Sequence, residues 1–338
     1  MLGYAVGVDL GATNLRVGAV DERGQLLDKI SIPIAGLGGS ESVIARMCAG
    51  IADLTSQFKG THALRGIGIA IPGIIDIASG ILIESPNLPD WSNCPVREEV
   101  ERRLGTRVIL ENDANAAAMG EFWLGSAADY TSACMLTLGT GVGGGIILNG
   151  ALWHGMSGMA GEPGHITIYP DGAPCPCGNR GCLEQYAGAR GIVRMAQEAA
   201  ASGRAPALAS AIAANPDFTS GDLYDLAKHG DAAAHAIFET VGRALGIGIA
   251  AIINLLNLPI LVVAGGGSAG WDLFSPFLME EVQRRSYVYR AARQPDENGG
   301  TQPTKICRAV LGADAGIYGA ARLPMLPAEV GEHEQNAS

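Results

Sequence analysis

Hydrophobic residues alternate with small and polar ones in two similar patterns that lie far apart along the chain. Residues 4–10 and 15–20 predict two short strands joined by a glycine-containing turn, and residues 25–30 predict a third strand that pairs back. Residues 133–138 and 143–148 predict the same arrangement downstream, followed by an Asn-Gly hairpin turn. The two turns align as Leu10-Gly11-Ala12-Thr13 on Leu138-Gly139-Thr140-Gly141. This internal repeat predicts a duplicated α/β domain with a glycine-rich hairpin in each half.

Other apolar segments complete the two halves. We expect further strands at residues 65–71, 107–111, 259–263 and 305–311, and helices at residues 114–124 and 271–285. Gly125 is placed to end the first of these helices, and the chain after about residue 190 is rich in alanine and predicted to be helical.

The domain boundaries follow from this order of elements. We expect a small α/β domain at residues 1–117, to which residues 310–325 can return, and a larger α/β domain at residues 118–309. Residues 323–338 contain proline and polar residues without periodicity, and residues 326–338 are expected to form a frayed tail.

One segment, residues 244–264, is long and uncharged enough to be compared with a membrane span. It contains Asn254, Asn257 and Pro259, and three consecutive glycines follow it. A buried helix that ends near Leu258, followed by a buried strand, accounts for these residues better than a transmembrane helix does. No membrane segment is therefore expected.

The net charge of the chain limits the classes of binding partner that we expect. The 338 residues include 23 Lys and Arg against 34 Asp and Glu, a formal net charge of −11. Proteins that bind nucleic acid normally present a basic surface, so none is expected as a partner. A small anion is still possible, because backbone N–H groups bind anions without net positive charge. No basic region opens the N-terminus, so no signal peptide is predicted and the protein is expected to be cytoplasmic.

The glycine-rich turns are candidates for phosphate binding. The chain has 48 glycines, about twice the usual share of about 7%. Residues 139–144 match the Gly-x-Gly-x-x-Gly sequence pattern of dinucleotide-binding sites. A strand is predicted after them, however, where such a site needs a helix. Residues 265–270 do precede a helix, yet no second strand with an acid follows at the required distance. Ordinary tight turns are the alternative for each loop alone.

Hydroxyl and carboxylate groups accompany these turns. Thr13, Thr137 and Thr140 add hydrogen-bond donors beside them. Asp9, at the end of the first predicted strand, could hold a hydrated Mg²⁺ near bound phosphates.

Three of the seven cysteines crowd into eight residues, with His165 ten residues upstream. Three thiolates and one imidazole, from Cys175, Cys177, Cys182 and His165, suit tetrahedral Zn²⁺. Four protein ligands would close the site, so the zinc would be structural. The alternative is a loop with free thiols.

Carboxylates occupy positions suited to proton transfer and to sugar recognition. Asp113 follows a predicted strand and starts a helix, where it could accept the proton of an attacking hydroxyl or could only cap the helix. The spacing of the residues favours neither of these two roles over the other. Glu162 and Glu184 flank the proposed metal ligands in sequence, and a metal that folds this loop would bring both carboxylates towards His165.

Taken together, these segments resemble the ROK family of sugar kinases and repressors, and within it the bacterial glucokinases. The resemblance extends from Asp9 to about Ala321 and rests on five motifs: DLGATN at residues 9–14, ENDANA at 111–116, LGTGVGGG at 138–145, GEPGH at 161–165 and CPCGNRGCLE at 175–184. Pro163 differs from many relatives, which have an aliphatic residue there.

The resemblance implies an actin-like, ribonuclease H-type fold of two domains with the active site in the cleft between them. It also implies an ATP- and Mg²⁺-dependent kinase that phosphorylates the 6-hydroxyl of glucose, and a homodimer. Asp113 would be the general base. The implied sugar-binding residues are Asn87, Asn112, Glu162, His165 and Glu184. The implied nucleotide-binding residues are Asp9, Gly11, Ala12, Thr13, Asn14, Gly139, Thr140, Gly141, Gly265, Gly266 and Gly267.

Alternatives to this activity stay open within the family and outside it. The sugar could be N-acetylmannosamine or N-acetylglucosamine, and the phosphoryl donor could be polyphosphate. A sugar-responsive repressor would need a DNA-binding region, and the acidic composition and the eight residues before Asp9 disfavour it. An oxidoreductase using the loop at Gly265 would bind NAD(P).

Overall fold

The computed structural model describes residues 2–11, 13–85, 88, 90–293 and 302–327. The chain forms two compact units. Unit 1 comprises Met1–Gly120 and Gly316–Ser338, and unit 2 comprises Glu121–Ala315. The chain therefore passes twice between the units.

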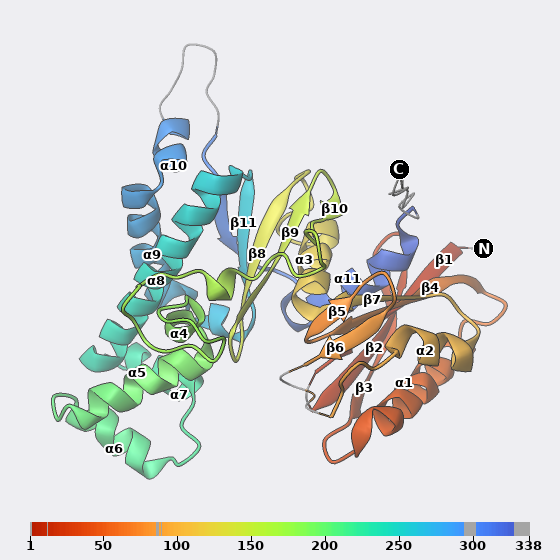
Figure 1. The fold of residues 1–338 in the computed structure, drawn as a ribbon, viewed down its shortest axis with the longest axis horizontal. Helices are drawn as coiled ribbons and strands as arrows, with labels where there is room; N and C mark the ends of the chain where they lie inside the picture. The colour runs from red at the N-terminus through yellow and green to blue at the C-terminus, as the bar shows by residue number, and fades with distance from the viewer. Residues whose placement is uncertain (1, 12, 86–87, 89, 294–301, 328–338) are drawn as a thin grey trace, which may run out of the picture. The chain divides into compact units, whose positions relative to one another are not determined.

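Unit 1 is built on a five-stranded mixed sheet in the order β3-β2-β1-β4-β7 (Figure 1). β1 pairs antiparallel with β2 and parallel with β4, β2 pairs antiparallel with β3, and β4 pairs parallel with β7. The bounds are β1 Leu2–Leu10, β2 Asn14–Asp21, β3 Leu26–Pro33, β4 His62–Ile71 and β7 Val108–Asn112. A small antiparallel pair, β5 Ile74–Asp76 and β6 Ile81–Glu84, completes the strands described in this unit.

Unit 2 repeats the same plan, with a sheet in the order β10-β9-β8-β11-β12. Its strands are β8 Ala133–Leu138, β9 Val142–Leu148, β10 Ala151–Leu152, β11 Ile260–Ala264 and β12 Lys305–Arg308. In both sheets the first three strands form an antiparallel meander, and the fourth and fifth run parallel to the first. The duplicated α/β fold predicted from the internal repeat is confirmed.

The helices of unit 1 are α1 Gly39–Ser56, α2 Val96–Leu104, most of α3 Asp113–Leu124 and nearly all of α11 Ala315–Arg322. α11 lies directly against the sheet and against α3, because Gly7, Gly68 and Gly319 have no side chains there. A Cβ at any of these three would collide with backbone, that of Ile317, Ala320 or Ala116 respectively. The apolar core beneath α1 includes Met47, Ile51 and Leu54, which are fully buried.

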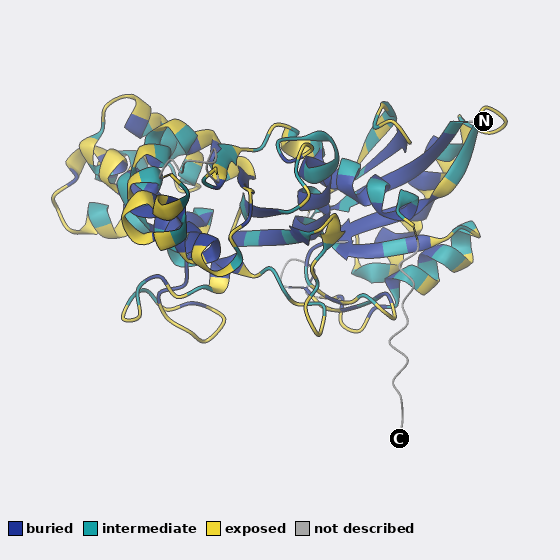
Figure 2. Ribbon diagram, turned by 90° about the horizontal axis from the view of Figure 1, so that it is seen from above, coloured by how far each residue is buried: buried dark blue, intermediate teal, exposed yellow. Residues whose placement is uncertain are grey.

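Unit 2 carries more helices: α4 Glu184–Ala187, α5 Ala189–Ala201, α6 Pro206–Ala214, α7 Ser220–Lys228, α8 Ala232–Leu256, α9 Trp271–Arg285 and α10 Tyr287–Ala292. α8 is long and apolar enough to cross a membrane by length and composition, but 67% of its most apolar window is buried. It is the core helix of this unit, and residues along it such as Leu245 and Ile249 are fully buried. Figure 2 colours the chain by burial and shows the strands mostly in dark blue. The predicted helix and following strand are thus found as α8 and β11.

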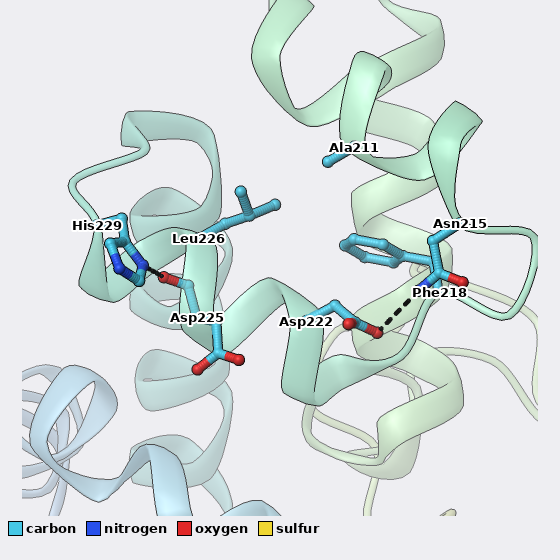
Figure 3. A pocket seen from close by; sticks show the side chains of 7 residues that line it. All are labelled: Ala211, Asn215, Phe218, Asp222, Asp225, Leu226 and His229. Atoms are coloured by element: carbon cyan, nitrogen blue, oxygen red, sulfur yellow. Dashed lines mark hydrogen bonds between the residues drawn. The ribbon is translucent and has the colours of Figure 1, made fainter.

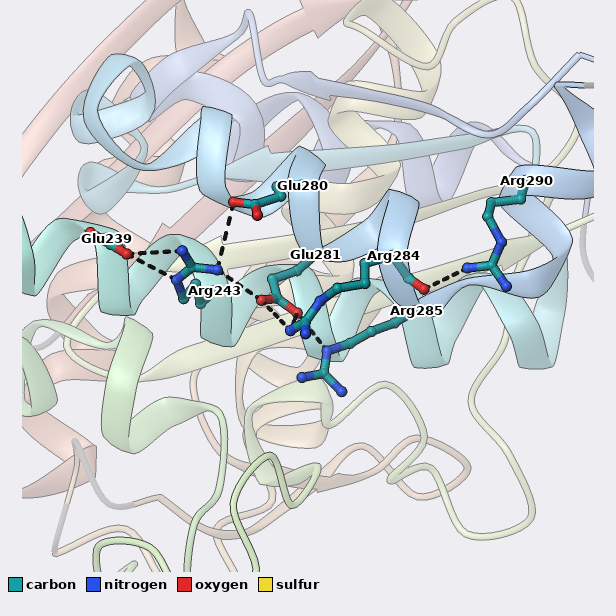
Figure 4. A network of polar contacts seen from close by, with 7 residues as sticks. All are labelled: Glu239, Arg243, Glu280, Glu281, Arg284, Arg285 and Arg290. Carbon is teal, nitrogen blue, oxygen red and sulfur yellow. Dashed lines mark hydrogen bonds and ion pairs between the residues drawn. The ribbon is translucent and has the colours of Figure 1, made fainter.

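α8 and α9 pack closely and share a charged network. Gly242 and Gly246 leave no side chain between α8 and the backbone of α9. The Glu281 carboxylate, 2% exposed, accepts hydrogen bonds from Arg243 on α8 and from Arg284 and Arg285 on its own helix (Figure 4). Burial by itself would raise the pKa of Glu281, but these three guanidinium groups lower it to about 2.

One expectation for the C-terminal part of the chain was wrong. The strand expected at residues 305–311 ends at Arg308, because the buried Glu121 carboxylate binds the N–H groups of Val310 and Leu311 in place of a neighbouring strand. Residues 323–325 form a short 3₁₀ helix, and the Pro324 ring packs on Gly66. The expected frayed tail falls mostly on residues 328–338, which lie outside the described residues.

Candidate functional site

Hydrogen bonds fix the backbone of the turn between β8 and β9, Gly139–Gly141. Leu138 pairs with Val142 across it, and the Gly139 N–H donates to the Gly141 carbonyl at 3.0 Å. The carbonyls of Gly139 and Thr140 accept the N–H groups of Ala189 and Arg190, the first residues of α5. Within the described part of the chain, the amides of Thr140 and Gly141 donate to no protein acceptor. This β8–β9 turn therefore presents backbone donors of the kind that bind phosphate.

The loop at Gly265–Gly267 lies next to this turn. It leaves β11 and enters a 3₁₀ helix, Gly266–Gly270, which leads into α9. Gly265 has φ +82°, a conformation that favours glycine, and a Cβ there would lie 2.5 Å from the Leu138 carbonyl oxygen. A Cβ on Gly267 would lie 2.8 Å from that of Leu138. The fold thus brings together two glycine loops that are more than a hundred residues apart in sequence.

A hollow of about 350 Å³ adjoins the β8–β9 turn at the start of α5. Apolar atoms form most of its lining, and it is lined by Ala189, Arg190, Val193, Arg194, Gln197, Phe218, Thr219 and Ser220. A second hollow, of about 250 Å³ between α6 and α7, shares Phe218 with it (Figure 3). None of the described residues that were predicted for a site lines either hollow.

The corresponding turn of unit 1 follows β1. The Gly11 N–H donates to the Asn14 carbonyl at 3.0 Å, and the Thr13 carbonyl accepts the N–H groups of Ile34 and Ala35. Ala12, which was also predicted to bind nucleotide, lies outside the described residues. Asp9, at the end of β1, is paired with Arg16 of β2 at 2.5 Å. Sequence reasoning missed this arginine, although Arg16 stands directly opposite Asp9 in the strand register.

Asp113 is the first residue of α3, and its neighbour makes the helix cap. The Asn112 Oδ1 accepts the N–H groups of Ala114 and Asn115, at 2.9 and 3.3 Å. The Asn112 amide also donates to the Gly73 carbonyl at 3.3 Å. Spacing did not decide whether Asp113 is a base or only a helix cap. In the structure Asn112 caps the helix, and the Asp113 carboxylate accepts the Ala114 N–H at 2.9 Å. Asn87, predicted to bind sugar, lies outside the described residues.

The four predicted metal ligands gather in unit 2. One ligand atom each from His165, Cys175, Cys177 and Cys182 lies within 4.8 Å of the other three. The Cys177 and Cys182 sulfurs are 3.8 Å apart, and so are the Cys175 sulfur and the His165 Nδ1. Two sulfurs bound tetrahedrally to zinc at about 2.3 Å would be separated by about 3.8 Å. The donor set and its spacing therefore fit a four-coordinate zinc ion.

Local turns bring these ligands together. Gly178 and Gly181 have φ of +91° and +67°, which lets the chain reverse between Cys175 and Cys182. The Cys175 N–H donates to the Asn179 carbonyl, and Thr167 and Cys182 form an isolated β-bridge that returns the loop to the His165 segment. Because all the ligands lie within 18 residues, this part of the site could be predicted from the sequence.

Two carboxylates lie beside the metal ligands. Partial desolvation by the surrounding protein raises the pKa of Glu162, even though the residue is exposed by its accessible surface area. The charge of His165 lowers this pKa, and the charge of Glu184 raises it further. Glu184 is half-buried at the start of α4, and its Oε2 accepts the Val142 N–H at 3.0 Å. Glu162, His165 and Glu184 thus form one polar cluster, and Glu184 joins it to the β8–β9 turn.

Comparison with known proteins identifies the family. The model of the ROK family matches residues 5–325. The chain belongs to the ROK family. A glucokinase of Thermotoga maritima is 38% identical over 94% of this chain and 96% of its own length, and a glucokinase of Halalkalibacterium halodurans is 35% identical over 94% and 93%. A crystal structure of a ROK family glucokinase from Streptomyces griseus, in complex with glucose and AMPPNP, superposes with a TM-score of 0.74 at 32% identity, covering 95% of this chain and 99% of that one.

Membership of the ROK family also identifies the duplicated fold. Its sheets and helices are those of the actin-like sugar-kinase fold, as the sequence resemblance implied. In this ROK protein, the predicted site residues of unit 2 lie on the β8–β9 turn, the Gly265 loop and the metal-ligand loop. The described ones of unit 1 lie at the end of β1, on the β1–β2 turn, and at the end of β7 and the start of α3, while Ala12 and Asn87 lie outside the described residues.

Proposed function

We propose that this ROK protein is an ATP-dependent hexose kinase that phosphorylates the 6-hydroxyl of glucose. The observation that carries the proposal is the direct contact in unit 2 between a polar cluster suited to sugar hydroxyls and a turn with backbone donors suited to phosphate. The identity to glucokinases over most of the chain supports the same reaction.

In the proposed reaction, Asp113 accepts the proton of the sugar 6-hydroxyl as that oxygen attacks the γ-phosphorus of ATP. The bond from phosphorus to the bridging oxygen breaks, so the products are sugar 6-phosphate and ADP. Capping of α3 by Asn112 supports this role, because it leaves the helix start stable without relying on Asp113 alone.

Sugar hydroxyls are assigned to Asn87, Asn112, Glu162, His165 and Glu184. Carboxylates, an imidazole and amides supply both donors and acceptors, which is what vicinal hydroxyls require. A primary amide carries two N–H donors, so Asn112 can donate to Gly73 and to a sugar at once.

A structural zinc ion is proposed for His165, Cys175, Cys177 and Cys182. When bound, the ion would fix the loop that carries the sugar-binding groups and would add no reacting ligand, since four protein atoms fill its coordination sphere. His165 would ligate the metal through one ring nitrogen and keep the other for sugar.

The nucleotide is assigned to the two hairpin turns and the Gly265–Gly267 loop, with Mg²⁺ held through water near Asp9. The hollow beside Ala189 and Arg190 supports a place for the nucleoside, since it is mainly apolar and adjoins the β8–β9 turn. A cytoplasmic homodimer is part of the same proposal, by likeness to the family.

The test is a substrate panel with the purified protein. Glucose, N-acetylmannosamine and N-acetylglucosamine are each offered with Mg²⁺ and either ATP or polyphosphate, and phosphorus NMR identifies the phosphorylated hydroxyl. We expect glucose 6-phosphate from ATP at the highest kcat/KM. Faster turnover of an N-acetylhexosamine or of polyphosphate would reassign the substrate or the donor, and no turnover of any sugar would reject the kinase.

A further inference from the structure

Glu184 contacts both parts of unit 2 that the proposed kinase needs. It follows Cys182 by two residues and lies close enough to Glu162 to raise the pKa of that carboxyl. Its own carboxylate reaches across 42 positions of sequence to the N–H of Val142, the residue that follows Gly141. One side chain thus joins the polar cluster to the β8–β9 turn.

The β8–β9 turn is held at two places, and the two differ in kind. Backbone N–H groups of Ala189 and Arg190 hold the carbonyls of Gly139 and Thr140. On the other side the Glu184 carboxylate, a side chain, holds the Val142 N–H. A Cβ on Gly141 would collide with the Glu184 Oε2, so the carboxylate packs directly on the α-carbon of Gly141.

We infer that Glu184 is a positioning residue for nucleotide, in addition to any contact it makes with sugar; the inference rests on the proposed function. The amides of Thr140 and Gly141 bind phosphate well only if the turn is held in its binding conformation beforehand. The acceptor on Val142 supplies this restraint from the C-terminal side of the turn. Without it, the Val142 N–H would need another partner and the turn would relax.

This arrangement couples the two substrates. A sugar that orders the Glu184 carboxylate also orders the β8–β9 turn, so nucleotide should bind more tightly when sugar is present. Linkage requires the reverse effect to be equal, with nucleotide tightening sugar binding by the same factor. The coupling should disappear when the carboxylate is removed.

The test measures nucleotide binding with no sugar present, by calorimetric titration of the full-length protein with AMPPNP and Mg²⁺. E184A should weaken AMPPNP binding about tenfold, the usual effect of losing one hydrogen bond to a charged group. E184Q should stay within about twofold of wild type, because the amide oxygen accepts the same N–H. E280Q is the matched control, since Glu280 is an exposed carboxylate on α9 of the same unit that pairs with Arg243 and belongs to none of the assigned binding groups, and it should leave AMPPNP affinity unchanged.

Wild-type affinity in E184A would overturn the positioning role, and so would an E184Q variant as weak as E184A, because charge and not the acceptor would then matter. These results differ from failure of the proposed function, in which wild type itself would bind no AMPPNP. Thermal unfolding establishes that each variant is folded.

G141A tests the contact between Gly141 and Glu184 by changing the glycine. If E184A does not fold, G141A by itself tests the inference. Its added methyl would push the carboxylate off Val142, so AMPPNP binding should weaken while Glu184 is present. All three of the nearest atoms to that methyl belong to Glu184, so G141A should cost little in the E184A background. Losses that add in the double variant would contradict the inference.

Discussion

The ring of Pro163 fills the space that a side chain on Gly144 would occupy. A Cβ at position 144 would lie 2.6 Å from the Pro163 Cγ, and a Cβ at Gly164 would collide with the Val142 carbonyl. The segment that carries Glu162 and His165 is therefore packed directly on β9. The absence of a side chain at Gly144 therefore accommodates the Pro163 ring.

We predict that G144A destabilises the loop and weakens sugar binding. The methyl would meet both the Pro163 ring and, at 2.9 Å, the Met135 carbonyl, so either the loop or β9 has to shift. Overpacking of this kind costs about 1–3 kcal/mol, and the KM for sugar should rise more than that for ATP. Differential scanning calorimetry and steady-state kinetics measure the two effects.

G221A is the control for this variant. Gly221 lies near the start of α7 in the same unit, and the one atom near an added Cβ is the Thr219 Oγ1 at 3.4 Å. Alanine in a helix is favoured over glycine by about 0.5–1 kcal/mol, so stability should be unchanged or slightly higher. A G144A protein as stable and active as G221A would contradict the packing argument.

Metal analysis of the purified protein should find one zinc per chain. C177S/C182S should lose the metal, because two of four ligands are gone, and a chelator should lower the melting temperature of wild type but not of the double variant. C307S should keep its zinc, since Cys307 lies on β12 outside the cluster. Zinc retained in full by C177S/C182S would exclude this site.

D113N should lower kcat by at least about 10²-fold while the dissociation constant for glucose changes little. The asparagine oxygen can still accept the Ala114 N–H, so α3 should remain intact. D53N, an exposed substitution on α1 of the same unit, should have wild-type turnover. If D113N retained full kcat, Asp113 could not be the base.

The Glu281 network should make unit 2 sensitive to acid. The pKa of Glu281 is about 2 in the folded protein, below its value of about 4.3 in an unfolded chain, so its stabilisation is complete above about pH 4.5. The stabilisation is lost progressively as the pH falls towards 2. E281Q should lower the free energy of unfolding by about 3 kcal/mol at pH 7, by leaving three arginines without the buried carboxylate.

Urea unfolding at several pH values measures this effect. The difference between wild type and E281Q should shrink between about pH 4.5 and 2. E280Q is the comparison, because the Glu280 side chain is 59% exposed and pairs with Arg243 at 3.6 Å, so its loss should cost under about 1 kcal/mol. Equal effects of E280Q and E281Q at pH 7 would show that burial does not decide the strength of the network.

Sequence by itself determined the features of this protein that depend on neighbours along the chain. The alternation of apolar residues located the strands of both five-stranded sheets apart from the short β10, and the helix expected at residues 271–285 is α9. The ligands from His165 to Cys182 could be predicted as a set because turns at Gly178 and Gly181 suffice to bring them together. The repeated turn motif was enough to predict the duplication, since each hairpin forms locally.

Tertiary structure alone decided the contacts between segments that are distant in sequence. These contacts depend on which backbone segments approach each other closely. They are the hydrogen bond from the Val142 N–H to Glu184, the packing of Pro163 on Gly144, and the hydrogen bonds to Glu121 that end β12. Asn112 and not Asp113 became the main cap of α3 for the same kind of reason, because Gly73 of another segment holds its amide in place. Packing selects among the hydrogen bonds that a residue can make, and a linear pattern of residue types does not contain that selection.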